Sequence, residues 1–169
     1  MPRTDTAKLL VEQAVSQLRA VSTALAALRN EMQSLAASLP EYPVVMGMFG
    51  VGPALGPQLM AEIGDVRRFY SKKALVAFAG IDAPPYQSGQ MKIRSRSISK
   101  RGSSSLRRTL FLVMSVILQR SPADEPVYQF MDRKRAEGKP YRVYMMASAN
   151  KFLRFYYATV KQYLNSLEA

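Results

Sequence analysis

A regular spacing of apolar residues over the first forty positions constrains the fold of this chain more than any other feature. The residues alternate four and three positions apart, with no glycine or proline between them: Ala7, Val11, Ala14, Leu18, Val21, Leu25, Leu28, Met32, Leu35 and Leu39. A 3.5-residue period keeps one apolar seam along a single helix, as in coiled coils. The seam could instead pack on the helix's own domain; the polar opposite face favours the coiled coil.

Two prolines end this helix and mark a domain boundary. Pro40 and Pro43 cannot continue a helix, and each also restricts the residue before it. We therefore predict a coiled-coil helix over residues 1–40 and a second domain over residues 41–169. A coil of this kind brings copies of the chain together, so a homodimer or tetramer is expected.

The charge and the missing residue types limit the function. The 169 residues carry a formal net charge of +12, which implies a polyanionic partner, and nucleic acid is the usual one. The absence of a membrane-length apolar run and of a signal peptide predicts a cytoplasmic protein with no membrane partner. The chain has no cysteine and no histidine, which excludes thiolate chemistry and an imidazole base.

The rest of the chain shows helical signals throughout. Apolar spacing and cap residues predict helices over 72–79, 106–119, 126–136 and 141–167. On the last of these, the face that contains Phe152 and Tyr156 is predicted to be core rather than a base-stacking surface. Because no strand alternation is present, the predicted fold is all-α.

The segment Gly50-Val51-Gly52-Pro53 has the pattern of a helix-hairpin-helix motif. Gly50 and Gly52 would let the backbone approach a phosphate closely. An ordinary corner between two helices is the alternative. Pro57 disturbs the pattern, because it lies one turn into a helix that would start at Pro53. Either the helix starts later, at Gly56-Pro57, or its first turn is irregular.

The stretch YQSGQMKIRSRSISKRGSSSLRR, residues 86–108, contains seven serines and seven cations and no acidic residue. The cations predict contacts with phosphate, because guanidinium groups match phosphate oxygens and stay charged. They are Lys92, Arg94, Arg96, Lys100, Arg101, Arg107 and Arg108. A serine here would be a nucleophile only if something other than imidazole activated it, and the stretch cannot hold magnesium alone. We predict no metal site within this chain.

The order of these motifs resembles the C-terminal domain of the insertion-sequence family one-ten transposases. The resemblance runs from about residue 48 to residue 112 and rests on GVGPALGPQLMAEIGD, PYQSGQ and ISKRGSSSLRR. It implies a recombinase with a serine nucleophile before glycine, here Ser88, which forms a phosphoserine link to DNA. It also implies phosphate contacts in the SKRG…LRR segment and, in some members, a structured guide RNA. The family's acidic, magnesium-binding nuclease-like domain has no counterpart in this sequence, so we expect a truncated form that binds nucleic acid without recombining it alone.

Two functions therefore remain open for the chain. In the first, it is the C-terminal part of a serine-dependent DNA transposase or recombinase, and Ser88 attacks the scissile phosphate. In the second, it is a non-catalytic nucleic-acid-binding module that dimerises through its coil, and Ser88 only shapes a turn. Charge and the glycine hairpin support both; the place of Ser88 in the family pattern separates them.

Overall fold

A computed structural model describes residues 5–83, 87–88, 91–92 and 97–168 of the chain. Seven α-helices make up most of it: α1 (Asp5–Ala37), α2 (Tyr42–Met46), α3 (Leu55–Ile63), α4 (Lys72–Ala79), α5 (Ser104–Arg120), α6 (Pro126–Ala136) and α7 (Tyr141–Leu167). A 3-10 turn, η1 (Val66–Arg68), precedes α4, and two short antiparallel strands, β1 (Gln87–Ser88) and β2 (Met91–Lys92), lie between α4 and α5. The prediction of an all-α fold is confirmed, apart from this two-residue strand pair.

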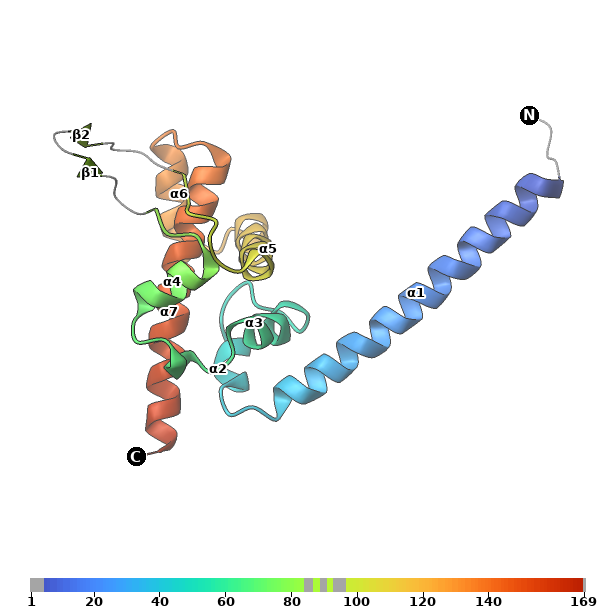
Figure 1. Ribbon diagram of the computed structural model, residues 1–169, viewed down its shortest axis with the longest axis horizontal. Helices are drawn as coiled ribbons and strands as arrows, with labels where there is room; N and C mark the ends of the chain where they lie inside the picture. Colours follow the sequence, from blue (N-terminus) through green and yellow to red (C-terminus); the bar gives the residue numbers. More distant parts are fainter. Residues whose placement is uncertain (1–4, 84–86, 89–90, 93–96, 169) are drawn as a thin grey trace.

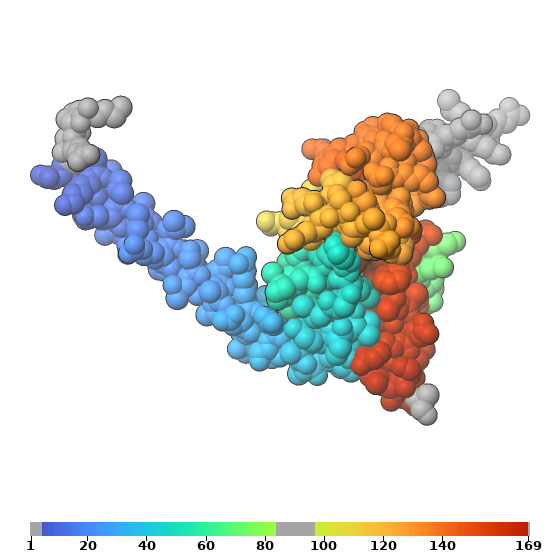
Figure 2. Space-filling view, turned by 180° about the vertical axis from the view of Figure 1, so that it is seen from behind, coloured from blue at the N-terminus to red at the C-terminus, as the bar shows by residue number. Residues whose placement is uncertain are grey.

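Helix α1 runs away from the body of the molecule and meets it only near its C-terminal end (Figures 1 and 2). Of its described residues, only Ala36 is buried. The seam is exposed along its length, for example 67% at Leu18 and 64% at Leu28. The alternative that this helix packs along its own domain is therefore wrong, because the seam contacts nothing within the described chain over most of its length.

Helix α7 is the centre of the helical body. It packs against α4, α5 and α6, and α5 in turn packs against α3 (Figure 1). Phe152 and Tyr156 of α7 are almost completely buried, which confirms that these aromatic residues belong to the core. Near the end of α7, Leu164 is buried and Leu167 is 56% exposed.

Local cap signals fix several helix ends where the sequence places them. The Ser71 hydroxyl accepts a hydrogen bond from the Ala74 amide and starts α4, and Gly80 ends it in the left-handed conformation at φ 65°. Ser103 caps α5 in the same way as Ser71 caps α4. Helices α6 and α7 have the predicted bounds. None of the helices in the described residues is long and apolar enough to cross a membrane.

The segment around Gly50 leads into its second helix later than a start at Pro53 would require. Helix α3 begins at Leu55, so Pro57 occupies its third position. An amide at this position has no intrahelical acceptor, so proline costs no hydrogen bond there. The helix therefore starts later than Pro53, but one residue before the start expected at Gly56-Pro57. The helix-hairpin-helix motif itself stays a prediction.

Candidate nucleic-acid interface

The serine-rich loop is fastened at its base by hydrogen bonds between its two limbs. The Ser99 amide donates to the Asp82 carbonyl at 2.8 Å, and the Lys100 amide donates to the Gly80 carbonyl at 3.0 Å. The Ser99 hydroxyl also donates to a carboxylate oxygen of Asp82. Lys100 itself has φ 55°, a conformation rare for a residue with a side chain. The limbs of the loop therefore leave the helical body together and in fixed register.

Close to this base, the backbones of the two limbs come into contact at Gly102. A Cβ atom at this position would overlap the carbonyl oxygen of Phe78. The next amide, that of Ser103, donates to the same carbonyl at 2.7 Å. Gly102 is therefore required because the end of α4 and the start of α5 approach too closely for any side chain.

Arg107 ties the same region together from α5. Its Nη1 donates to the carbonyls of Ala79 and Gly102, both at 3.0 Å, and to that of Ser103 at 3.2 Å. Arg107, one of the predicted phosphate ligands, thus holds the end of α4 against the start of α5. Arg101 and Arg108 lie exposed on either side of the Gly102 turn. Phosphate contact by these three residues stays a prediction.

Ser88 lies at the end of the strand pair that extends the loop. Ser88 pairs with Met91, and the predicted cation Lys92 pairs with Gln87, the residue before the predicted nucleophile. In Figure 1 this pair stands away from the helical body. Arg94 and Arg96 lie outside the described residues.

A groove of about 960 Å³ opens between the base of this loop and helix α7. Both limbs of the loop line it, together with single residues of α5 and α6 and a face of α7. Four cations line it: Lys100, which the sequence predicted, and Arg142, Lys151 and Arg154 of α7, which it did not. Ile81, Ile98, Phe111, Val143 and Met146 supply most of its apolar surface.

Lys151 is held in place within this groove. Its Nζ donates to the Pro126 carbonyl at 2.6 Å and lies 5.2 Å from the centre of the Phe130 ring. Arg133 lies 5.4 Å from the same ring centre. Both separations are within the range of cation–π attraction. The positive charge at this end of the groove therefore has a fixed position.

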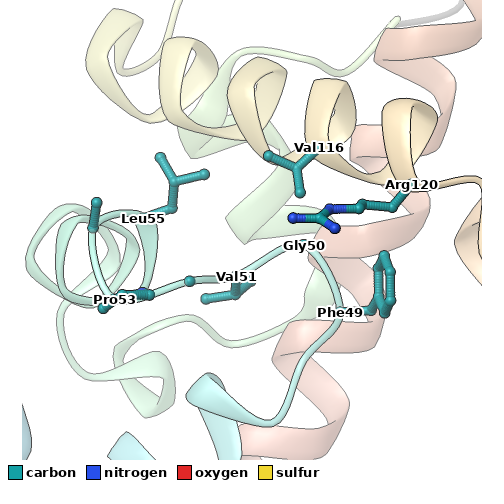
Figure 3. A pocket seen from close by; sticks show the side chains of 9 residues that line it. Phe49, Gly50, Val51, Pro53, Leu55, Val116 and Arg120 are labelled. Carbon is teal, nitrogen blue, oxygen red and sulfur yellow. The ribbon is translucent and has the colours of Figure 1, made fainter.

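The glycine hairpin forms a second, smaller hollow of about 510 Å³, and the Arg120 guanidinium lies at Gly50 (Figure 3). Gly50 has φ 81°, and a Cβ there would lie 2.7 Å from a side-chain carbon of Ile117. Close packing against α5 thus accounts for Gly50. Gly52 has open space around it, and its carbonyl accepts the Gly56 amide at 2.8 Å. Phosphate binding by the two glycines stays a prediction.

The basic cluster at residues 67–73 is partly neutralised. Arg67 forms ion pairs with Asp65 and with Glu168 near the C-terminus. The hydrogen bond from Arg67 lowers the pKa of the Asp65 carboxyl, and the same contacts raise the pKa of Arg67. Arg68 covers the rings of Phe69 and Phe78 at 4.6 and 4.8 Å. Arg68, Lys72 and Lys73 are exposed and form no ion pair among the described residues, so their charges stay available to a nucleic acid.

The acidic residues that the structure describes are not arranged as a magnesium site. No group of three or more potential metal ligands occurs among the described residues. Asp82 is the acidic residue of the loop base, and one of its carboxylate oxygens accepts the Ser99 hydroxyl. A hard cation such as magnesium prefers several oxygen ligands at once, so this part of the chain does not fit it.

Comparison with known proteins gives the family. The model of the "Transposase IS116/IS110/IS902 family" matches residues 42–129, just over half of the chain. The chain belongs to this transposase family. It is similar to the "Pilin gene-inverting protein" of Moraxella bovis, with 31% identity over 134 residues, and equally to that of Moraxella lacunata. It is 28% identical over 121 residues to the "Insertion element IS900 uncharacterized 42 kDa protein" of Mycobacterium paratuberculosis.

This chain corresponds to only part of each of these relatives. The chain spans 38% of the length of the two pilin gene-inverting proteins and 29% of the insertion-element protein. The matched residues include the glycine hairpin, the serine loop and α5, and they end within α6. Helix α7, which supplies three of the four groove cations, lies beyond the residues that the family model matches.

The groove residues of α7 carry a signal that the sequence analysis did not use. Arg142, Met146, Asn150 and Arg154 follow one another at intervals of four, and Val143, Ala147 and Lys151 do the same one position later. Such spacing places them on one helix face. The face lies beside the buried one, and only the packing of α7 against the loop shows that it lines a groove.

Proposed function

We propose that this chain is the part of a DNA transposase that binds the nucleic-acid strand and supplies Ser88 as the nucleophile. One observation carries the proposal: the PYQSG segment belongs to a loop whose limbs are fastened together beside a groove with four cations. Hydrogen bonds that hold the base of the loop in one geometry favour the presentation of an attacking group to DNA bound beside it. Family membership supports the reaction class.

The proposed reaction consists of two displacements at phosphorus. The Ser88 hydroxyl loses its proton as its oxygen bonds to the scissile phosphorus, and the bond from that phosphorus to one sugar oxygen breaks. The sugar oxygen leaves with the electron pair and takes up a proton. A strand-end hydroxyl then loses its proton and attacks the phosphoserine, and the serine oxygen leaves with the electron pair and is protonated again. Cations near the loop would stabilise the negative charge that gathers on the phosphate in each step.

The reaction also needs magnesium ligands and a second copy of the serine, which the groove and the loop do not supply. The magnesium-binding carboxylates expected from the family resemblance are proposed to lie outside the described residues, in an acidic domain that acts together with this one. The exposed seam of α1 is proposed to pair with another copy of the chain, which would bring two serines to two strands. A structured guide RNA is proposed as a second polyanion for the exposed cations.

The deciding experiment traps the covalent intermediate. A protein in which this chain is joined to an acidic, metal-binding domain is incubated with labelled nicked DNA, and the products are separated under denaturing conditions. We expect a protein–DNA adduct that Ser88→Ala abolishes and Ser95→Ala preserves. An adduct that survives Ser88→Ala would place the nucleophile elsewhere. If recombination proceeds without any adduct, serine attack itself is excluded.

A binding measurement on the chain itself accompanies this test. Ser88→Ala removes no charge, so the Kd for DNA should stay within about twofold of the unaltered value. If strand exchange also survives this substitution, the chain is the non-catalytic binding module, and Ser88 only shapes the turn.

A further inference from the structure

The groove between the loop base and α7 combines apolar surface with positive charge. A double helix would use only the positive charge. Its floor is largely apolar, with Phe111, Met146 and Val143 among the residues that line it. Its cations are Lys100, Arg142, Lys151 and Arg154, and no acidic residue is among the described residues that line it. Cations alone would suit the phosphates of a duplex, but an apolar floor favours a ligand that also presents an apolar face.

Asn150 adds a polar group with unused hydrogen-bonding capacity to this floor. Its side chain is partly buried, lines the groove, and makes no hydrogen bond to any described residue. An amide presents both donors and an acceptor, which match the edge of a nucleobase. Arg142 and Arg154, one at each end of the same helix face, are exposed and form no ion pair within the described chain.

A ligand with apolar faces, a polar edge and negative charges alongside is an unstacked nucleotide. In a duplex, base faces are covered by neighbouring bases, and only edges and phosphates are accessible. In a single strand, each base offers a face for apolar and aromatic side chains, while the phosphates follow the cations. An acidic peptide would match the cations, and its backbone could pair with Asn150, but its charged side chains present no flat apolar face to the lining of the groove.

The groove also lies close to the proposed nucleophile. Ala83 lines it and is five residues before Ser88. A chain spans at most about 3.6 Å per residue, so the two Cα atoms are within about 18 Å. At about 3.4 Å per nucleotide step along a stacked strand, this distance corresponds to about five steps.

We propose that this groove binds an unstacked nucleotide of a single polynucleotide strand, within about five nucleotides of the site of strand cleavage. The base lies on the apolar floor with its edge at Asn150, and the flanking phosphates contact Arg142 and Arg154. The position relative to cleavage rests on the function proposed for Ser88, whereas binding in the groove does not.

The test uses this chain and a short, fluorescently labelled oligothymidylate, followed by fluorescence anisotropy at several salt concentrations. An oligomer of the same length with an abasic backbone serves as the comparison. We expect the abasic strand to bind at least about fivefold more weakly. Asn150→Ala should abolish most of that difference. The double variant Arg142→Ala and Arg154→Ala should reduce the slope of log K against log salt by about 1.4, or about 0.7 for each phosphate that is no longer neutralised.

The matched control removes two cations far from the groove. Arg19→Ala with Arg29→Ala on α1 should leave both the affinity and the salt slope unchanged. Circular dichroism verifies that each variant remains helical; because Arg142 and Arg154 are exposed, folding should survive their replacement. An oligouridylate arm distinguishes a DNA from an RNA strand, and tight binding of either supports the proposal.

Three results would overturn it. The abasic strand could bind as tightly as oligothymidylate, the groove and control variants could behave alike, or a polyglutamate peptide could displace the oligonucleotide from the groove at lower concentration than unlabelled oligothymidylate does. Ser88→Ala should leave oligonucleotide affinity within about twofold, since it removes no charge. A failed groove test and a failed adduct test are therefore separate outcomes.

Discussion

At Gly102, any side chain would collide with the carbonyl oxygen of Phe78, the same oxygen that accepts the Ser103 amide. Gly102→Ala must therefore push the end of α4 away from the start of α5. We expect the free energy of unfolding to fall by about 2–3 kcal/mol, as overpacking and a weakened hydrogen bond act together. Chemical denaturation measures this, with Gly52→Ala as the control, because Gly52 has open space around it. Equal decreases in the free energy of unfolding of the two variants would contradict a close backbone contact at Gly102.

Tyr156 makes stability depend on alkaline pH. Burial, with a smaller contribution from the nearby Glu41, raises the pKa of its hydroxyl above the ordinary value. Above about pH 10 the unfolded chain releases this proton while the folded chain keeps it, so the free energy of unfolding falls as pH rises. The decrease approaches about 1.4 kcal/mol per pH unit from this group.

Replacement of the phenol tests this dependence. The stability of Tyr156→Phe should decline more gently above about pH 10 than that of the unaltered chain, whereas Tyr70→Phe, at an exposed position, should follow the unaltered chain. Thermal or denaturant unfolding at a series of pH values gives the slopes. Parallel declines in the two variants would exclude Tyr156 as their source.

At the scale of the element, helix α1 has an apolar seam that nothing in the described chain covers. Leu25 and Leu28 on this seam are 45% and 64% exposed. If the seam pairs with another copy, Leu25→Lys with Leu28→Lys should shift the protein toward monomers, because charge at these positions opposes coiled-coil packing. Analytical ultracentrifugation reads the change in mass. The control adds the same charge on the opposite face with Asn30→Lys and Gln33→Lys, and should not alter the mass.

The helices show which structural features local sequence determines. The ends of α4, α6 and α7 follow from caps, glycine and proline, which act within one turn, and the sequence predicted them. The groove was not predictable in this way. Lys100 and Arg154 are more than fifty residues apart in sequence, and both line one groove only because the fold brings α7 beside the loop base. Likewise, Gly50 fits a phosphate-binding pattern in sequence, but it packs against α5 in the fold.

At the scale of the whole molecule, the net positive charge and the surface proposed for self-association lie in different parts. The charge is in the helical body, and the association surface is on α1. Helix α1 contains three basic and three acidic residues, so it is neutral, and most of the net charge of +12 lies in the helical body. Nucleic-acid affinity and its salt dependence should therefore come from the body alone. The coil would add affinity only by joining two bodies on one polymer.

Two triple variants, each of which removes three positive charges, distinguish the contribution of the helical body from that of α1. Lys100→Ala, Arg101→Ala and Arg108→Ala together should reduce the slope of log K against log salt for duplex DNA by up to about 2.7, or about 0.9 for each phosphate that these side chains neutralise. Lys8→Ala, Arg19→Ala and Arg29→Ala remove the same charge from α1 and should leave the slope unchanged. Fluorescence anisotropy from low to physiological salt provides both slopes. Similar reductions would mean that affinity follows net charge and not the position of these cations around the loop.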